Sequence, residues 1–397
     1  MNTTNDDQFL SEDEQLAVIE PIWPQITTEE ATQALTAFSK ISEDSTVTIV
    51  KDAQRIITSG AIVQVTTSEA DVPKKYFLKR FHISVMTPKQ LQPKHKAANQ
   101  YAKNLHSQIS APRIATYIET PDGQTTVIIG EWIYELSSIA EGEDRYEKYH
   151  SWQPPQTSVE AFSIGQALAF LHNAASCSNQ PADPGPSYYD NRYELIPNFV
   201  IEESTALHYF LDKRPVTKKW IENNAPNLKE DLKSCIPPSL NPDIAREIQK
   251  LPHIWIHGDG HCSNMTFHQK EVHTIFDFGL ASPAPAVMDL AIALERNTLE
   301  WVKITAGDLA SYRLDIAKAI MDGYQSVRPL NQSEKKALPA IIASVHVEAA
   351  LNLIGYHIIA NLPNNAQWSY DTYFRFHSTW FNTQAGKEYL AGIKRSL

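Results

Sequence analysis

Hydrophobic positions along the chain follow two periods. Before residue 134, short apolar runs separated by turn residues predict antiparallel strands. The expected strands are 47–50, 56–57, 61–65, 76–81, 114–118 and 126–133. Apolar residues three or four positions apart predict helices, which dominate after residue 155. The expected helices are 27–41, 93–108, 157–172, one that starts at Pro242, 309–327 and 333–360.

This pattern predicts an α+β protein with two lobes. Residues 1–25 carry six acids and no Lys or Arg, which is typical of an acidic tail. Residues 26–133 are expected to form a lobe around an antiparallel sheet. Residues 134–397 are expected to form a larger, mostly helical lobe.

One predicted strand carries a lysine among aromatic residues. Alternation in the segment YFLKRF places Phe77, Lys79 and Phe81 on one face of the strand. A lysine between two inward aromatic side chains is unusual. The alternative is an edge strand whose lysines lie in water.

Residues 254–291 hold the residues with the strongest chemical signal. An apolar run leads into His257-Gly258-Asp259, Asn264 follows five residues later, and a second apolar run leads into Asp277-Phe278-Gly279. Asp259 can orient and deprotonate a hydroxyl, and Asn264 and Asp277 supply oxygen ligands that suit Mg²⁺. The spacing of 13 positions from Asn264 to Asp277 allows a hairpin that returns the second ligand beside the first. The segment predicts a phosphoryl-transfer site.

Composition excludes several classes of protein. The formal charge of −11 argues against nucleic acid as the main partner. Three widely spaced cysteines fit reduced thiols better than a disulfide framework. No apolar run approaches the roughly 18 residues of a membrane span, and the acidic N-terminus does not resemble a signal peptide. We expect a cytoplasmic protein without a membrane partner.

Charge is distributed unevenly between the expected lobes. Residues 72–118 contain nine Lys or Arg and no acid, whereas residues 119–147 contain eight acids and only Arg145 as a base. A basic first lobe next to an acidic segment suits a polyphosphate held near a polar or cationic acceptor. The acids of 141–147 would suit an amino-sugar or amino-alcohol.

The motifs HGDGHCSN, FDFG, LKRF and VMDLA together resemble the aminoglycoside phosphotransferase and choline kinase family. The resemblance covers residues 50–360 and is strongest in 254–291. It implies a bilobal protein-kinase-like fold. It also implies transfer of the γ-phosphate of ATP, or of GTP, with Mg²⁺, to a hydroxyl of a small aminoglycoside-, amino-alcohol- or sugar-like molecule.

The resemblance also implies a role for each matching residue. Asp259 would be the catalytic base, and Asn264 and Asp277 the Mg²⁺ ligands. Lys79 would hold the nucleotide phosphates beneath a loop that contains Gly60. The hinge that takes the adenine would comprise Ile129, Glu131 and Ile133. His257 and Asp289 would support the catalytic loop.

Two departures from the family pattern stand out. Gly60 is the only glycine before Lys79, so a glycine-rich loop is missing. The family places a glutamate on the helix after the lysine, but residues 72–118 contain no acid. Gln92, Asn99 or Gln100 could contact Lys79 instead, or another segment could supply the acid.

Other interpretations of the same residues remain open. His257-x-Asp259 with a distant histidine has the spacing of a non-haem iron site. A catalytically inactive, nucleotide-binding module would keep the fold without turnover, and in a purely structural interpretation the polar residues cap turns. The aromatic residues of 368–381 could form core packing or a wall of the substrate site.

Overall fold

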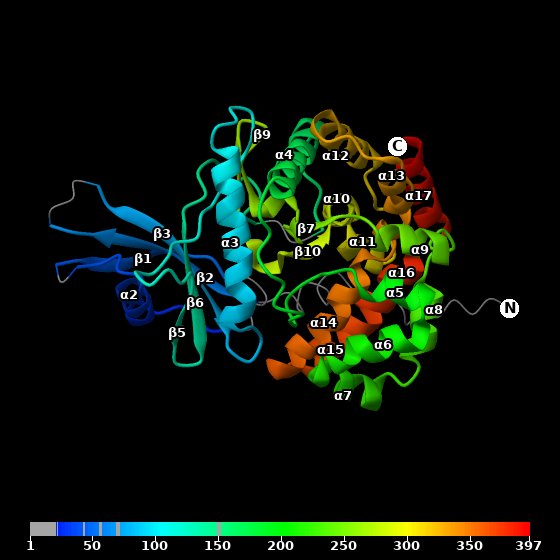
Figure 1. The fold of residues 1–397 in the computed structure, drawn as a ribbon, viewed down its shortest axis with the longest axis horizontal. Coiled ribbons are helices and arrows are strands. Elements are labelled where there is room, and N and C mark those ends of the chain that lie inside the picture. Colours follow the sequence, from blue (N-terminus) through cyan, green and yellow to red (C-terminus); the bar gives the residue numbers. More distant parts are fainter. Residues whose placement is uncertain (1–20, 22, 43, 55–57, 69–71, 149–151) are drawn as a thin grey trace.

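The structure, a computed structural model, describes residues 21–397 apart from 22, 43, 55–57, 69–71 and 149–151. Figure 1 shows two lobes, with helix α3 (Pro88–Leu105) standing between the sheet of the first and the helices of the second. This arrangement confirms the α+β class. The predicted strand at 56–57 and most of the acidic tail lie outside the described residues.

The first lobe is built on an antiparallel sheet of five strands in the order β1-β2-β3-β6-β5. These strands are β1 (Thr46–Asp52), β2 (Ser59–Thr66), β3 (Lys74–His82), β5 (Val127–Ile129) and β6 (Trp132–Ser138). Strand β3 lies at the centre, so the edge-strand interpretation of Lys79 is wrong. The sheet buries its central strand between two neighbours and fixes which side chains share a face.

The two faces of the sheet have different partners. Leu78 of β3 packs with the apolar residues of helix α2 (Thr28–Ala37), which Thr27 caps in a capping box with Glu30. Phe81 lies on the opposite face and packs with Leu91 of α3. Alternation therefore places Lys79 on the α3 face, where it is only 3% exposed.

Two predicted strands differ from the structure for local reasons. The expected strand 126–133 is a hairpin of β5 and β6, because Gly130 has a left-handed φ of +60° and reverses the chain. Of the expected strand 114–118, only β4 (Arg113–Ile114) forms, and it pairs in parallel with β9 of the second lobe.

Two predicted helices also change their bounds. Helix α3 begins at Pro88 rather than Pro93, because Thr87 and Gln90 form a capping box and proline suits the first helical position. The expected helix 333–360 is broken into α13 (Gln332–Ile342) and α14 (Val345–Ile359), which meet at 48°. The break follows Ile342 and does not fall at Pro339.

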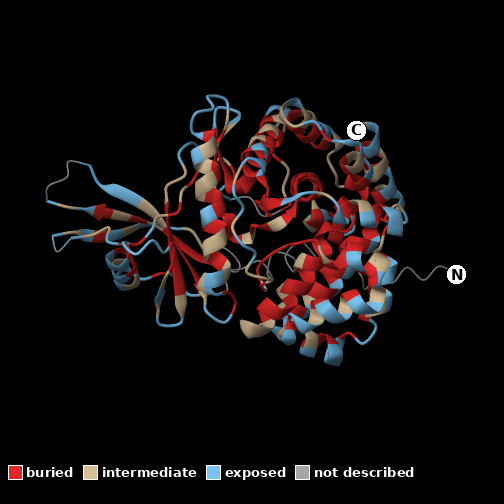
Figure 2. Cartoon of the chain, in the orientation of Figure 1, coloured by how far each residue is buried: buried red, intermediate tan, exposed pale blue. Residues whose placement is uncertain are grey.

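The second lobe is mostly helical. Its helices also include α4 (Ser158–Ser176), α5 (Leu195–Ile201), α6 (Glu203–Asp212), α7 (Pro215–Asn224), α8 (Leu228–Cys235), α9 (Pro242–Gln249), α10 (Ala286–Thr298), α11 (Trp301–Thr305), α12 (Leu314–Val327), α15 (Pro363–Trp368), α16 (His377–Trp380) and α17 (Gln384–Arg395). Its short strands are β7 (His253–Ile256), β8 (Met265–His268), β9 (Glu271–Ile275) and β10 (Ser282–Pro285). Figure 2 shows buried residues filling the interior of this lobe and exposed residues on its outer helices.

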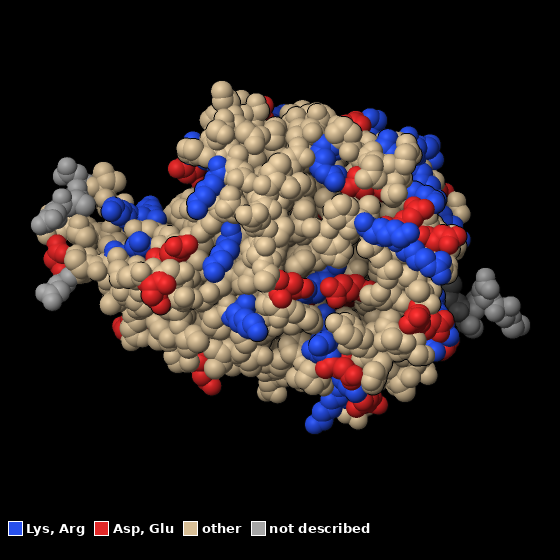
Figure 3. Space-filling model, in the orientation of Figure 1, with Lys and Arg blue, Asp and Glu red and all other residues tan. Residues whose placement is uncertain are grey.

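The apolar pair α13 and α14 belongs to this buried interior. Within the described residues, no single helix has the length and hydrophobicity of a membrane span, although this bent pair together reaches them. On the face shown in Figure 3, acidic and basic side chains are interspersed over the second lobe. Exposed ion pairs of this kind contribute little to stability.

Helices α4 and α12 approach each other through reciprocal glycines. A Cβ atom on Gly165 of α4 would lie 2.0 Å from the carbonyl oxygen of Ile320, and one on Gly323 of α12 would lie 1.9 Å from that of Phe162. Only glycine allows the two backbones to come this close. Helix α4 also carries His172, whose Nε2 lies 3.0 Å from Asp289 Oδ2 of α10.

A buried lysine joins α3 to the second lobe. Lys94 Nζ donates hydrogen bonds to the carbonyl oxygens of Gly279 (2.7 Å) and Tyr189 (3.1 Å) and is 3% exposed. Burial lowers its pKa from 10.5 to about 8. Lys94 therefore holds the first lobe against the FDFG segment at a cost in desolvation.

Substitution Gly323→Ala tests the close helix pair. Alanine normally stabilises a helix relative to glycine, but here its methyl group meets a backbone carbonyl. We expect a loss of about 1–3 kcal/mol in the free energy of unfolding, measured with urea. Gly392→Ala is the control, because its Cβ would meet only the end of the Leu314 side chain, which can rotate. Equal stability of the two variants would contradict the close approach.

Lys94 gives the stability a distinct pH dependence. The unfolded chain keeps the higher lysine pKa, so it binds more protons than the folded protein between pH 8 and 10.5, and stability rises through that window. Between pH 7.5 and 9.5, wild type should gain about 2 kcal/mol relative to Lys94→Met. Lys89→Met, at an exposed position of the same helix, should follow wild type. If the free energies of unfolding of wild type and Lys94→Met, measured with urea, change equally between pH 7.5 and 9.5, the prediction is wrong.

Candidate active site

The predicted catalytic residues lie on one hairpin and its flanking loops. Strand β7 leads into His257-Gly258-Asp259, a 3₁₀ turn (Cys262–Asn264) follows, and β8 and β9 then pair antiparallel. The amide of Phe276 donates to the carbonyl oxygen of Asn264 at 3.1 Å. The hairpin expected from the spacing therefore places Asn264 beside the start of the FDFG segment.

Polar groups contact one carboxylate oxygen of Asp259, and a cation lies near the other. Asn264 Nδ2 donates to Asp259 Oδ2 at 3.0 Å, and His261 Nε2 lies 3.3 Å from the same oxygen. Arg296 Nη2 lies 3.6 Å from Oδ1, outside hydrogen-bond range. Burial alone would raise the pKa of Asp259, but His261 and Arg296 hold it well below its usual range. The carboxylate is therefore charged and ready to accept a hydrogen bond.

Asp277 receives its partner from the first lobe. Lys79 Nζ donates to Asp277 Oδ1 at 2.6 Å, and the amide of Gly279 donates to the same oxygen at 3.2 Å. Asp277 has a left-handed φ of +63°, which turns its side chain toward the sheet. Burial raises its pKa, but Lys79 outweighs this effect, and the pKa stays below its usual value. One ion pair thus connects the two lobes inside the candidate site.

Asp289 and His257 brace the catalytic loop. Asp289, in the first turn of α10, accepts from the amides of His257 (2.8 Å) and Gly258 (2.9 Å), and His172 Nε2 lies 3.0 Å away. His257 Nε2 lies 2.8 Å from the carbonyl oxygen of Phe276, and its Nδ1 accepts from the amide of Asp259. Both ring nitrogens of His257 are engaged, which argues against the iron-site interpretation.

Helix α3 carries no acid that could pair with Lys79, but the neighbouring strand β6 does. Glu135 of β6 is the register partner of Lys79, so both side chains lie on the same face of the sheet. His95 of α3 places Nε2 2.8 Å from Glu135 Oε2 and stacks on Tyr117 with ring centroids 3.8 Å apart. Helix α3 therefore contacts the acid instead of carrying it.

The three alternatives considered for this role lie elsewhere. Gln92 donates to Thr126, Asn99 bonds to the backbone of Tyr117 and Gln100 donates to Asn104. Glu135 was missed because strand register cannot be derived from a single sequence. Its only signal was a place in the acidic stretch 119–147.

Gly60 and the three predicted hinge residues lie in strands and a tight hairpin of the first lobe, not in the loop and hinge that we expected. Gly60 lies in β2, opposite Lys79, and a Cβ there would be 2.9 Å from the carbonyl oxygen of Ala53. Ile129, Glu131 and Ile133 belong to the β5–β6 hairpin rather than to a hinge, and Ile133 pairs with strands on both sides. The connection to the second lobe follows the end of β6 at Ser138.

Further residues lie near Asp259, and no sequence motif indicates that they belong to the site. Arg296, at the C-terminal end of α10, lies over the ring of Trp152 with 5.5 Å to the centroid. Its Nη2 is 3.4 Å from the hydroxyl of Tyr373. Tyr373 and Trp368 come from the aromatic tail and contact Trp152, whereas Trp380 and Phe374 pack in the core. All four aromatic residues pack in or against one hydrophobic core, as expected for core packing, and the substrate-wall interpretation of the tail stays a prediction.

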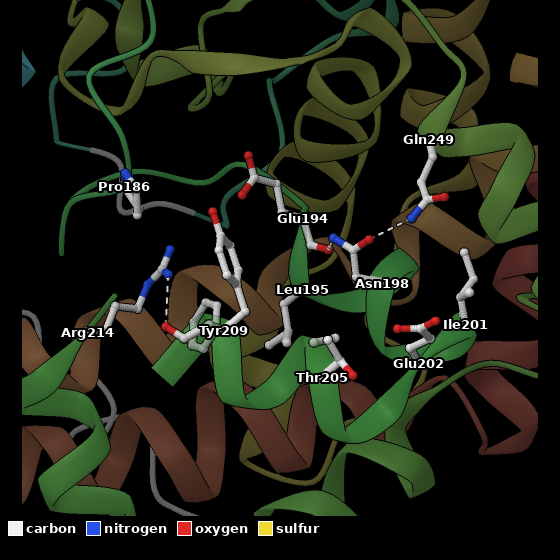
Figure 4. A pocket seen from close by; sticks show the side chains of 12 residues that line it. Pro186, Glu194, Leu195, Asn198, Ile201, Glu202, Thr205, Tyr209, Arg214 and Gln249 are labelled. Carbon is white, nitrogen blue, oxygen red and sulfur yellow. Dashed lines mark hydrogen bonds between the residues drawn. The ribbon is translucent and has the colours of Figure 1, made fainter. Parts of the chain in front are cut away.

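A separate cavity of about 370 Å³ lies among α5, α6 and the start of α7. Figure 4 shows Glu194 beside it and Gln249 bonded to Asn198, where Gln249 Nε2 donates to Asn198 Oδ1 at 2.6 Å. Burial, with help from Glu348, raises the pKa of Glu194. None of the predicted site residues lines this cavity.

Comparison with known proteins agrees with the motifs. Residues 54–330 match the model of the phosphotransferase enzyme family. The homoserine kinase of Agrobacterium fabrum is 31% identical over 190 residues, which span 48% of this chain and 50% of that protein. The homoserine kinase of Gluconobacter oxydans is 31% identical over 114 residues, or 26% of this chain and 34% of that protein. The chain thus spans a third to a half of the length of these relatives.

Two solved structures give similar coverage with low identity. An aminoglycoside phosphotransferase from Alicyclobacillus acidocaldarius has 16% identity and a TM-score of 0.47, covering 94% of this chain and 96% of that chain. The enzyme in a gentamicin–APH(2″)-IIa complex has 13% identity and a TM-score of 0.48, covering 91% and 98%. The family model alone covers more than half of the chain, and the structure has the two expected lobes, one built on an antiparallel sheet and one mostly helical. The chain belongs to the phosphotransferase enzyme family.

Proposed function

We propose that this protein transfers the γ-phosphate of ATP, in the presence of Mg²⁺, to a hydroxyl of a small molecule. The observation that carries the proposal is the buried Lys79–Asp277 pair beside Asp259 and Asn264. It brings a cation for phosphate, oxygen ligands for a metal and a hydrogen-bond acceptor for a hydroxyl into one site. Phosphoryl transfer depends on such positioning and charge neutralisation more than on covalent chemistry.

Asp259 orients the acceptor hydroxyl. Asn264 and His261 occupy its Oδ2, and Oδ1, which accepts no hydrogen bond from a described residue, is left to accept one from the hydroxyl. The lowered pKa makes Asp259 a weak base. This suits a loose transition state, in which the hydroxyl proton leaves late and the aspartate mainly fixes the line of attack.

Asn264 and Asp277 have the donor atoms that Mg²⁺ prefers. Asn264 gives Nδ2 to Asp259, which leaves its Oδ1 as an acceptor for a cation, and Asp277 supplies a carboxylate. Bound Mg²⁺ would neutralise charge on the phosphates. With Asp277 holding the metal, Lys79 would be free to contact the phosphates, and Glu135, its register partner on the same sheet face, would keep the lysine in place.

The acceptor remains open among small hydroxylated molecules. The curated relatives are homoserine kinases, so a hydroxy amino acid is one candidate. The aminoglycoside and amino-alcohol acceptors expected from the motifs are others. GTP is the alternative phosphate donor, and the connection that follows β6 at Ser138 is our proposed location for the nucleotide's adenine or guanine.

Asp259→Asn tests the proposed transfer. The amide cannot accept the hydroxyl proton, so kcat should fall by about 10²–10⁴ while Mg·ATP still raises the Tm. Phosphate transfer is measured with a panel of hydroxy amino acids, amino alcohols and aminoglycosides. Asp243→Asn, at an exposed position of α9, is the control and should match wild type.

Two results would contradict the proposal. Wild type that shows neither turnover nor stabilisation by Mg·ATP or Mg·GTP would exclude a nucleotide-dependent kinase. Stabilisation without turnover on any acceptor would favour the inactive binding module.

Glu135→Gln tests the acid on the strand. Without the charge of Glu135, Lys79 should be held less firmly in the site. We therefore expect kcat/KM for ATP to fall about 10–100-fold, with a raised KM for ATP. In a Lys79→Met background the same substitution should add little, because the two residues act as a unit. Glu131→Gln, at an exposed position of the β5–β6 turn, should have no effect. Additive losses in the double variant would show that Glu135 acts independently of Lys79.

A further inference from the structure

Arg296 brings positive charge next to the proposed catalytic base. Its guanidinium is 14% exposed and lies 3.6 Å from Asp259 Oδ1. Burial opposes its charge, but Tyr373, Asp259 and Glu295 outweigh burial and raise its pKa. Glu295 is its other acidic neighbour, at 3.7 Å, and burial raises the pKa of Glu295 to about 7. An arginine fixed here is always charged and faces the side of Asp259 where the acceptor hydroxyl would bind.

Two buried polar atoms beside Arg296 are left without partners. No described residue forms a hydrogen bond with Asp259 Oδ1 or with Trp152 Nε1, although both atoms are buried. Trp152 is 9% exposed and its ring lies under the guanidinium of Arg296. Orphaned buried polar groups are costly, and at a ligand site they are explained by atoms that the ligand supplies. One hydrogen-bond acceptor, Asp259 Oδ1, and one donor, Trp152 Nε1, thus have no partner among the described residues.

The backbone around this point departs twice from common geometry. Trp152 has a left-handed φ of +79°, which is rare for a bulky residue and is retained where surrounding structure enforces it. Tyr373 lies in a π-helical turn, Ser369–Phe376, a geometry found frequently at functional sites. Cys262 of the catalytic loop contacts the carbonyl oxygen of Gln153, so the Trp152 segment is tied to the loop that carries Asp259.

The acids that would suit a cationic acceptor are already paired. Glu141 contacts Arg113, and Glu143 contacts Arg145. Lys51 lies near Asp144 and Glu147. In this segment the acids are paired with Lys or Arg side chains of the protein. Arg296, in contrast, lies beside Asp259 and over the ring of Trp152, whose indole N–H has no hydrogen-bond partner among the described residues.

We infer that Arg296 and Trp152 receive a carboxylate of the acceptor, whose hydroxyl binds Asp259 Oδ1. The inference rests on the proposed function and narrows its acceptor to a small hydroxylated carboxylic acid, such as a hydroxy amino acid. The carboxylate accepts from the guanidinium and the indole N–H, and the hydroxyl donates to Asp259. Both orphaned atoms gain a partner, and Arg296 exchanges a loose contact with Asp259 for a direct one.

Matched acceptors test the inference in wild type. L-Homoserine, L-serine and L-threonine are each paired with the amine that lacks the carboxylate: 3-amino-1-propanol, ethanolamine and 1-amino-2-propanol. Binding is measured by titration calorimetry and transfer by ADP release. We expect at least one carboxylate to bind and react at least 100-fold better, in kcat/KM, than its amine. Failure of all three carboxylates to bind, or equal use of acid and amine, overturns the inference.

Variants separate recognition from support of Asp259. Arg296→Gln should raise Kd and KM for the carboxylate about 10–100-fold and leave the KM for ATP unchanged, and its loss of activity should be at least 10-fold larger on the carboxylate than on the amine. Arg296→Lys should restore part of the loss, and Trp152→Phe should weaken carboxylate binding while keeping the ring. Arg246→Gln, at an exposed position, should match wild type. Equal losses on acid and amine would mean that Arg296 only supports Asp259.

Binding also distinguishes this inference from the proposed function. A carboxylate that binds wild type but not Arg296→Gln supports the inference even without phosphate transfer, and that result would contradict only the kinase proposal. Transfer to amines or aminoglycosides alone would support the kinase and overturn the carboxylate site.

Discussion

The contact between Lys79 and Asp277 is the constraint on which the rest of the structure depends. Charges removed from water are stable only when they are closely paired, and this pair is drawn from segments 198 residues apart. Strand β3 must be central to bury the lysine, and Asp277 must adopt a left-handed backbone to meet it. Gly279 must lack a side chain, because a Cβ there would lie 3.1 Å from Asp277 Oδ1 and 3.4 Å from Lys79 Nζ.

Each of the two acids in the candidate site lies next to basic side chains. Asp259 lies between His261 and Arg296 on one side, and Asp277 meets Lys79 on the other. Each acid therefore stays ionised despite burial. Lys94 extends the arrangement from α3 to the backbone after Asp277. Polar contacts therefore surround the site, and beside them an apolar cluster that includes Phe81 and Tyr189 also joins the two lobes.

The parts of the site that could be predicted from the sequence are those encoded by local spacing. Asp259, Asn264 and Asp277 lie within one hairpin, and the cap of α2 at Thr27 follows from residues three positions apart. The β5–β6 hairpin was missed because a single glycine, Gly130, reversed a run that looked continuous. Glu135, Arg296 and Trp152 could not be found, since strand register and helix packing, which bring them to the site, act across long separations in the chain.

Placing the acid on β6 changes how such a site can be controlled. Where a helix carries the acid, a rotation of that helix can separate acid from lysine and switch the site off. Here Glu135 and Lys79 are neighbours in one sheet, so a movement of α3 leaves them together and alters only the contact through His95. A rotation of α3 would therefore not separate this acid from the lysine. The contact of Lys79 that does depend on the relative position of the two lobes is the one with Asp277.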